Sequence, residues 1–205
     1  HANRQRLSQL ASQPGPIDAI NPHYLCALLN TFIKPHDVVI NEAIRNSLAV
    51  YEQIDRDEPG TLMGLPGGGL GFSGGTALGI KLAHAHRRVI HVVGDGSFYF
   101  NNPSSVFAVA RQYQLPILTV VLDNGGWSAV KDSTYRMYPQ GVAHATDQFS
   151  SSLGGHTDFA AIAQAAGGHG ETLSDPSLAQ AAVERCFKAL DAGHSALLHA
   201  KVTPL

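Results

Sequence analysis

Continuous runs of apolar residues recur along the chain and predict buried β-strands. The clearest are residues 89–93, which are interrupted only by His91, and residues 117–122, which are interrupted only by Thr119. Such runs are typical of parallel strands that are covered on both faces of a sheet. We expect His91 to be a core histidine with satisfied hydrogen bonds. Further strands are predicted at residues 38–40, 169–172 and 196–202.

Between the strands, apolar residues recur every three or four positions, which is the spacing of an amphipathic helix. Asn21 and Pro22 suit the start of the first of these helices, and Asp158 suits the start of another. Because strands and helices alternate, the sequence predicts an α/β fold with a mostly parallel sheet and helices on both faces. The expected helices cover residues 22–32, 47–53, 74–85, 103–113, 128–135, 158–166 and 175–191.

Two segments fall outside this alternation. Residues 1–16 are polar and interrupted by prolines, with a short helical patch at residues 4–11, and we expect a linker from an upstream domain. Residues 17–205 form the predicted domain. Residues 138–156 show little apolar periodicity and are predicted to be one long loop, which is uncommon in compact domains without a functional reason.

Polar turns follow the two clearest strands. Residues 94–97 (Gly-Asp-Gly-Ser) come after the first strand, and residues 123–126 (Asp-Asn-Gly-Gly) come after the second. Because such sheets bind ligands beyond the carboxyl ends of their strands, we expect the two turns to meet at one site. Asp95 and Asn124 offer the oxygen ligands that Mg2+ prefers, and this ion usually keeps phosphate oxygens in its coordination shell. The turns therefore predict a magnesium-diphosphate site.

Two other interpretations of the glycine-rich stretches compete with this one. An isolated Gly-Asp-Gly is more often an Asx-type turn, and it is the second polar turn that favours a ligand site here. The segment from Gly69 to Gly74 also fits the G-x-G-x-x-G fingerprint of dinucleotide-binding domains, with Asp95 as the later acidic residue. That fingerprint needs a strand directly before its first glycine, whereas Pro66 and two further glycines stand there. A nicotinamide dinucleotide-binding domain is thus a remote alternative.

Composition narrows the class of protein. The 205 residues have a net charge of −2 and are 44% hydrophobic, which supports a real core and argues against a nucleic-acid or membrane-surface partner. No apolar run approaches the ~18 residues that would span a bilayer.

Cys26 and Cys186 lie far apart in the sequence, and we expect both to be small buried apolar side chains rather than partners in a disulfide. Such cysteines are typical of a reducing compartment, and we expect the cytoplasm. The start without Met and without a signal-peptide pattern indicates a processed, trimmed or partly observed polypeptide.

The two turns resemble the thiamine-diphosphate motif, in which Gly-Asp-Gly is followed by a helix and then by a strand that ends in Asn-Asn. Residues 68–72 also resemble the same region of the acetolactate synthase, benzoylformate decarboxylase and pyruvate decarboxylase group. The resemblance extends from about Ile17 to Val202 and departs from the motif at Asp123, which stands where the first Asn is usual. It implies a thiamine-diphosphate-binding fold, in the diphosphate-binding domain that is normally the carboxy-terminal third of such enzymes.

The resemblance also implies roles for individual residues. Asp95, Asn124 and the carbonyl of Gly126 are the implied magnesium ligands. Leu70 is the implied bulky residue beneath the thiazolium ring, and the carbonyl of Gly68 accepts a hydrogen bond from the aminopyrimidine. The residues expected to bind the cofactor, with Ser97 and the 42–47 segment at its diphosphate, are Glu42, Arg45, Asn46, Gly68, Leu70, Phe72, Gly94, Gly96, Ser97, Asn124, Gly126 and Trp127.

Three side chains near the turns have two open interpretations each. Arg45 either contacts a phosphate or lies on the surface, and Trp127 either faces the site or packs in the core. Lys131 either meets a substrate carboxylate or belongs to a solvated helix face. The candidates for lining a substrate pocket are Phe72, Phe98, Trp127, Lys131, Tyr135 and Arg136.

The activity implied by the resemblance is that of a magnesium-dependent lyase or transferase, a 2-oxo acid decarboxylase or carboligase that works as a homodimer or homotetramer. In this family the acid that activates the aminopyrimidine is a Glu on a pyrimidine-binding domain, of the same or a facing subunit, and no Glu here matches it. We therefore assign no catalytic residue in this chain. We expect this chain to be either the carboxy-terminal part of a longer enzyme or the diphosphate-domain subunit of a split decarboxylase. The alternative function for the chain is a non-catalytic cofactor-binding or regulatory module.

Overall fold

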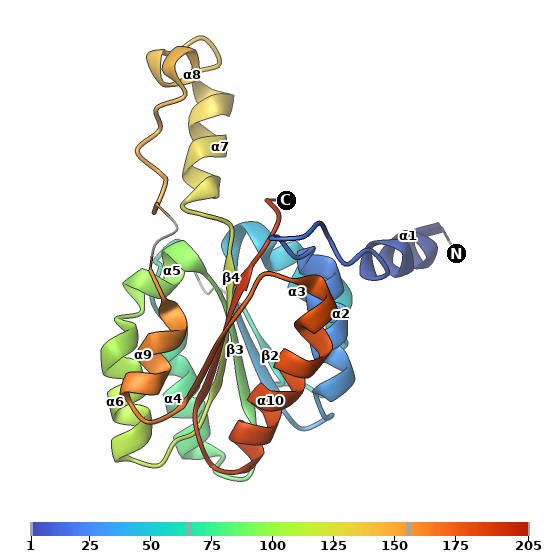
Figure 1. Cartoon of the computed structure of the whole chain (residues 1–205), viewed down its shortest axis with the longest axis vertical. Helices are drawn as coiled ribbons and strands as arrows, with labels where there is room; N and C mark the ends of the chain where they lie inside the picture. The colour runs from blue at the N-terminus through green and yellow to red at the C-terminus, as the bar shows by residue number, and fades with distance from the viewer. Residues whose placement is uncertain (1, 65–66, 155–156, 205) are drawn as a thin grey trace.

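A six-stranded parallel sheet lies at the centre of the protein (Figure 1). The computed structural model describes residues 2–64, 67–154 and 157–204. In the sheet the strands follow the order β2-β1-β3-β4-β6-β5. Their bounds are Val38–Glu42 (β1), Leu62–Met63 (β2), Val89–Gly94 (β3), Leu118–Asp123 (β4), His169–Leu173 (β5) and Ala196–Lys201 (β6).

Helices cover both faces of this sheet, so the predicted architecture is confirmed (Figure 1). On one face lie α2 (Pro22–Phe32), α3 (Ser47–Gln53) and α10 (Ala179–Asp191), which share one apolar core cluster with the strands. The other face is covered by α4 (Ser73–Ala83), α6 (Pro103–Gln112) and α9 (Phe159–Ala165). The remaining elements are α1 (Ala2–Ala11), α5 (Asp95–Phe100), α7 (Ser128–Met137), α8 (Val142–Thr146) and the short 3-10 helices η1 (Ile44–Asn46) and η2 (Pro176–Leu178).

Most predicted elements are confirmed, and three differ. The helix predicted at residues 22–32 has those bounds, and the Asn21 side chain caps it by accepting a hydrogen bond from the His23 N–H at 2.9 Å. The residues from Asp95 onward form the helix α5 where a turn was expected, and residues 142–146 form α8 inside the predicted loop. Strand β2 was not predicted, because two residues are too few to show a period. Residues 155–156 of that loop lie outside the described residues. The same holds for residues 65–66 of the glycine-rich stretch, which comprises residues 64–75.

The amino-terminal segment is helical, as the patch at residues 4–11 predicted, and it contacts the domain. The Asn21 side chain donates to the Leu10 carbonyl at 3.1 Å, and the Gln53 side chain donates to the Leu7 carbonyl at 3.1 Å. That residues 1–16 are a linker stays a prediction. No helix in the described part of the chain combines the length and the apolar character that crossing a membrane requires.

His91 lies in the middle of the sheet and is buried, as expected for a core histidine. Its Nε2 lies 2.6 Å from the Ser73 hydroxyl and its Nδ1 lies 3.3 Å from the hydroxyl of Thr119 on β4. Burial lowers the pKa of His91 to about 3. The imidazole is therefore neutral in the folded protein at pH 7.

This burial predicts a pH-dependent stability. The unfolded chain protonates His91 below its ordinary pKa of 6.5, whereas the folded chain does so only near 3, so the free energy of unfolding falls as the pH drops from 6.5. A single such group contributes a slope of up to about 1.4 kcal/mol per pH unit. We expect His91→Gln to reduce this slope in urea titrations between pH 7 and 5, with the exposed His84→Gln as control. Equal slopes in wild type and His91→Gln would contradict this assignment.

Candidate functional site

The carboxyl ends of β1, β3 and β4 lie side by side and carry the two predicted turns. Glu42 pairs with Val93 across β1 and β3, and Gly94 pairs with Leu122 across β3 and β4. The structure brings the turns together, because residues of both line one hollow of about 60 Å3. Its lining includes Ala43, Arg45, Leu70, Gly94, Asp95, Gly96, Ser97, Asn124, Gly126 and Trp127.

Buried polar atoms without hydrogen-bond partners gather at these strand ends. Among the described residues they include Asp95 Oδ2, Ser97 Oγ, both amide atoms of Asn46, and Trp127 Nε1. Buried polar groups in folded proteins are almost always paired, and leaving one unpaired costs about 1–3 kcal/mol. A carboxylate oxygen, a hydroxyl and an amide in this state suit a ligand that combines a cation with anionic oxygens. A 470 Å3 hollow at the opposite end of the sheet, beside Arg111 and His194, has no such atoms among its described lining residues.

Two neighbouring carboxyl groups define the electrostatics of the site. The Asp123 carboxylate accepts hydrogen bonds from His199 Nε2 at 2.7 Å, Lys201 Nζ at 2.5 Å and the Gly125 N–H at 2.9 Å. Burial opposes the ionisation of Asp123, but the bonds from His199 and Lys201 outweigh it and hold its pKa below the usual range. Burial and the negative charge of Asp123 raise the pKa of Asp95. A divalent cation at Asp95 Oδ2 would offset both effects, so Asp95 fits the role of a metal ligand.

The pair His199 and Lys201 was missed by the sequence analysis. Strand β6 lies beside β4, and its register places His199 opposite Val121 and Lys201 opposite Asp123. The signal was present in the sequence, because two polar residues two positions apart in an apolar strand point to the same face. Their function here is to keep Asp123 ionised and in place.

Glu42 has a different position from the one expected. Its side chain is buried and turned to the glycine-rich stretch, where it accepts hydrogen bonds from the Gly71 N–H at 2.5 Å and the Ser73 N–H at 3.1 Å. The Ser73 hydroxyl and the Asn101 amide, the latter at 3.1 Å, also donate to it. Four donors leave the Glu42 carboxylate committed to the protein, so it fixes the glycine-rich stretch and does not face a diphosphate.

Trp127 packs directly on the first turn of α5. A Cβ atom at Gly96 would lie 2.3 Å from Trp127 Cδ1, so only glycine leaves room for the indole there. The Trp127 ring also lies 6.0 Å from the Phe100 ring, centroid to centroid. Of the two open interpretations, the structure supports the one in which Trp127 lines the site.

The backbone of the second turn is shaped to expose oxygens. A Cβ atom at Gly126 would lie 2.1 Å from the Ser151 carbonyl oxygen, so the turn requires glycine. The Gly126 carbonyl accepts one hydrogen bond, from the Ser128 N–H at 3.0 Å, and Asn124 Oδ1 accepts one from the Ser128 hydroxyl at 3.0 Å. Because a carbonyl oxygen has two lone pairs, each retains one for a further partner.

The other predicted residues lie around the hollow or away from it. Leu70 lines the hollow and is 37% exposed, while Gly68 lies on the exposed turn before it. Phe72 packs against the core cluster between α4 and α6. Phe98 is buried in the core, 5.1 Å from the Phe159 ring, so the prediction that it lines a substrate pocket is wrong.

Arg45 and Lys131 both form ion pairs within this chain. Arg45 pairs with Asp132 at 2.7 Å, and Lys131 pairs with Asp147 at 2.9 Å. All four residues border a second hollow of about 820 Å3 that adjoins Asn124 and Gly126. Tyr135 and Arg136 lie further along α7, which extends away from the sheet (Figure 1).

The glycine-rich stretch does not have the context of a dinucleotide-binding fingerprint. Strand β2 ends at Met63 and lies at the edge of the sheet, and in the described residues just before Gly69, residues 67–68, there is no strand. The stretch instead leads into α4 while Glu42 of β1 holds its backbone. The remote nicotinamide alternative is therefore not supported.

Comparisons with known proteins agree with this geometry. Residues 46–200 match the family model described as "Thiamine pyrophosphate enzyme, C-terminal TPP binding domain". Benzoylformate decarboxylase of Pseudomonas aeruginosa is 28% identical over 158 residues, which is 77% of this chain and 28% of that protein. The large subunit of acetolactate synthase isozyme 3 from Escherichia coli is 34% identical over 109 residues, 53% of this chain and 18% of that protein.

A solved structure shows the same fold. The thiamine diphosphate-dependent 4-hydroxybenzoylformate decarboxylase of Rhodococcus jostii superposes with a TM-score of 0.79 at 24% identity, covering 92% of this chain and 34% of that one. This chain thus spans about a third or less of the length of these relatives. The chain belongs to the thiamine pyrophosphate (thiamine diphosphate) enzyme family and comprises its carboxy-terminal cofactor-binding domain.

Proposed function

We propose that this chain is the diphosphate- and magnesium-binding part of a thiamine-diphosphate-dependent 2-oxo acid decarboxylase or carboligase. The observation that carries the proposal is the group of unpartnered buried polar atoms, Asp95 Oδ2, Ser97 Oγ and the Asn46 amide, at the ends of β1 and β3. These atoms match the donor and acceptor needs of a magnesium-diphosphate group. Family membership and the similarity to decarboxylases and acetolactate synthases support the same activity.

In this proposal the magnesium ligands are Asp95, Asn124 Oδ1 and the carbonyl of Gly126. One carboxylate and two neutral oxygens leave room for phosphate oxygens and water in an octahedral shell. Bound thiamine diphosphate supplies the carbanion-stabilising ylid, and the protein supplies binding and orientation. Asp123, held by His199 and Lys201, fixes the turn that presents Asn124.

The diphosphate is held by groups at the rim of the same hollow. Ser97 Oγ and the Asn46 Nδ2 donate to phosphate oxygens, and Trp127 Nε1 is a further unpartnered donor. Gly94 and Gly96 let the ligand approach the backbone closely. Leu70 and the carbonyl of Gly68, on the stretch that Glu42 fixes, orient the thiazolium and the aminopyrimidine. Arg45 and Lys131 border the 820 Å3 hollow and are proposed for the outer rim of the site. Phe72, Tyr135 and Arg136 line neither hollow, and their roles stay predictions.

Catalysis in this proposal needs a second protein surface. No glutamate among the described residues lines the hollows at the cofactor site. A pyrimidine-binding domain, of the same or a facing subunit, supplies the activating glutamate in a homodimer or homotetramer. The two free buried cysteines fit a reducing compartment, and we propose the cytoplasm.

Turnover by the full natural polypeptide tests this function. We expect consumption of at least one 2-oxo acid, from a panel that includes pyruvate and benzoylformate, only when both thiamine diphosphate and Mg2+ are present. Omission of either should lower the rate at least 100-fold, because the ylid carries out the carbon chemistry. Tight cofactor binding without turnover of any panel member would favour the alternative, a non-catalytic cofactor-binding module.

A further inference from the structure

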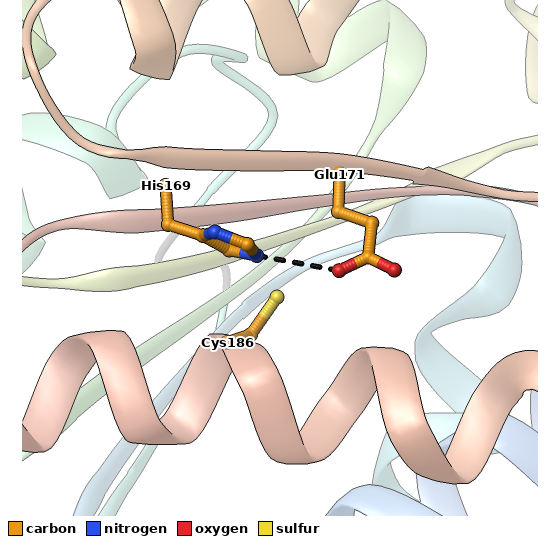
Figure 2. Close-up of side chains that lie close together, drawn as sticks. All are labelled: His169, Glu171 and Cys186. Atoms are coloured by element: carbon orange, nitrogen blue, oxygen red, sulfur yellow. Dashed lines mark hydrogen bonds and ion pairs between the residues drawn. The ribbon is translucent and has the colours of Figure 1, made fainter.

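Three metal-ligating side chains converge between β5 and α10, away from the cofactor site. We call this group, His169, Glu171 and Cys186, the β5–α10 cluster (Figure 2). One ligand atom from each of them lies within 4.8 Å of the other two. His169 is the first residue of β5, at the opposite end of the sheet from the cofactor-binding turns. The proposed function uses none of these residues.

The fold itself brings the cluster together. Alternate residues of a strand point to opposite faces, so His169 and Glu171 share one face of β5. Gly170 points to the other face, where a Cβ atom would lie 2.0 Å from the carbonyl oxygen of Ala160 on α9. His169 and Glu171 therefore point to α10, and Figure 2 shows the Cys186 sulfur directed toward them from that helix.

The hydrogen-bonded pair His169 and Glu171 has the separation of two ligands on one tetrahedral ion, and Cys186 Sγ lies within 4.8 Å of both. His169 Nε2 lies 3.3 Å from Glu171 Oε2. Two ligands at the usual zinc distances of about 2.0–2.1 Å, set at the tetrahedral angle, are themselves about 3.3 Å apart. The Cys186 side chain is fully buried and its sulfur makes no hydrogen bond to any described residue. It is thus a buried soft donor, aimed at a nitrogen and an oxygen donor, that lacks a partner.

A neighbouring arginine holds the carboxylate in place. Arg185 Nε donates to Glu171 Oε2 at 3.0 Å, and Arg185 Nη2 contacts Oε1. These two contacts fix the direction in which the Glu171 carboxylate points. The Arg185 side chain is 51% exposed, so water solvates its charge on the side away from Glu171.

We propose that the β5–α10 cluster binds Zn2+ or a similar thiophilic divalent ion through His169 Nε2, Glu171 Oε2 and Cys186 Sγ, with water as fourth ligand. Nitrogen, carboxylate and thiolate are the ligands that zinc takes in proteins, whereas Mg2+ prefers oxygen alone. On binding, the Cys186 thiol releases its proton to solvent and a sulfur–zinc bond forms. The ion would join the edge strand β5 to α10 and stabilise that edge of the sheet.

Spectroscopic titration with Co2+ tests this site in the full natural polypeptide. Excess Mg2+ and thiamine diphosphate are included to occupy any oxygen-rich cofactor site, so the outcome does not depend on the proposed function. We expect a thiolate-to-cobalt charge-transfer absorption that saturates at one ion per chain and is displaced by Zn2+. Cys186→Ala should abolish the absorption, and His169→Gln and Glu171→Gln should each weaken Co2+ binding at least tenfold.

The second buried cysteine provides the matched control. Cys26→Ala removes a free buried thiol on the same face of the sheet, and it should leave the absorption and the affinity unchanged. His169→Gln changes a partly exposed side chain, so it tests the site even where Cys186→Ala fails to fold. Absence of the absorption in wild type, its survival in Cys186→Ala, or unchanged affinity in His169→Gln would overturn the proposal.

Discussion

Asp95→Ala is expected to weaken the magnesium-dependent binding of thiamine diphosphate by more than about 100-fold. Even loss of a group that only orients a metal ligand typically costs about 10–100-fold in affinity, and Asp95 supplies the one carboxylate in the proposed ligand set. A 100-fold loss corresponds to about 2.7 kcal/mol of binding free energy. Calorimetric titration of the full natural polypeptide with thiamine diphosphate in excess Mg2+ measures it.

The same substitution has an opposite effect on the protein without cofactor. Burial and the charge of Asp123 raise the pKa of Asp95, so ionised Asp95 destabilises the fold as the pH rises through that pKa. At pH 8 without Mg2+, Asp95→Ala should therefore unfold at the same or a higher urea concentration than wild type. Glu184→Ala, which removes an exposed carboxylate of α10, is the control for both measurements. Unchanged cofactor affinity in Asp95→Ala would refute the assignment of Asp95 as a metal ligand.

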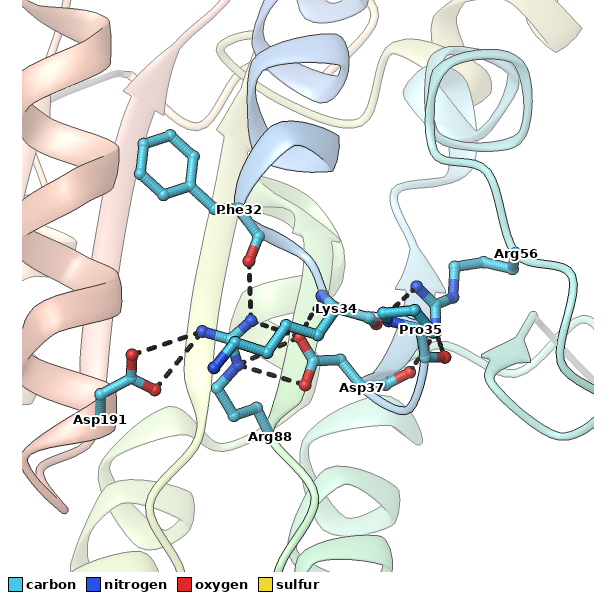
Figure 3. A network of polar contacts seen from close by, with 7 residues as sticks. All are labelled: Phe32, Lys34, Pro35, Asp37, Arg56, Arg88 and Asp191. Carbon is cyan, nitrogen blue, oxygen red and sulfur yellow. Dashed lines mark hydrogen bonds and ion pairs between the residues drawn. The ribbon is translucent and has the colours of Figure 1, made fainter.

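A network around Asp37 and Arg88 joins the amino ends of β1 and β3 (Figure 3). Arg88 Nη2 lies 2.5 Å from Asp37 Oδ2, and Arg88 Nε lies 3.1 Å from Oδ1. Arg88 also donates to the Phe32 carbonyl at 2.7 Å, and its guanidinium lies 4.9 Å from the centre of the Phe187 ring. The Asp37 side chain is only 5% exposed, so this ion pair is shielded from water.

Asp37→Ala is expected to lower the free energy of unfolding by about 3–5 kcal/mol. Removing one partner of a buried ion pair leaves the other charge desolvated without compensation, and losses of this size follow. Arg88→Met should cost a similar amount, and the double variant should cost less than the sum of the two. Urea denaturation of the three variants and wild type measures these differences.

Asp191 provides a control within the same network. It contacts the same guanidinium at 3.4 Å, but its side chain is 52% exposed, and exposed ion pairs contribute about 0–1 kcal/mol. Asp191→Ala should therefore destabilise the protein by less than about 1 kcal/mol. If Asp37→Ala costs no more than Asp191→Ala, the network does not stabilise the ends of β1 and β3 as described.

The fold was predictable because the local patterns agree with the tertiary structure. Strands β3 and β4 are buried on both faces, so their sequences are mostly apolar, apart from His91 and Thr119, and are easily recognised. Strand β2 has two residues at the edge of the sheet and leaves no such pattern. Helix α5 was expected as a turn because its first residues, Asp95-Gly96-Ser97, are typical of turns. Packing of Phe98 in the core favours the helix there, which no local signal shows.

The site was predictable only in part, because side-chain direction depends on distant partners. The positions of Asp95 and Asn124 after strands indicated the shared hollow, and topology alone brings them together. Glu42 also ends a strand, but three donors from the glycine-rich stretch, and the Asn101 amide just after α5, turn it away from the expected ligand. His199 contacts Asp123 across 76 positions of sequence, which only the pairing of β4 with β6 reveals.

Binding of thiamine diphosphate to the full natural polypeptide, with Mg2+ and with Mg2+ removed by a chelator, tests the central claim most directly. The arrangement of Asp95, Asn124 and Gly126 predicts one cofactor bound per chain in Mg2+, and loss of that binding in the chelator. Failure of the polypeptide to bind thiamine diphosphate in saturating Mg2+, or equal binding in the chelator, would contradict the claim that these strand ends hold a magnesium-diphosphate.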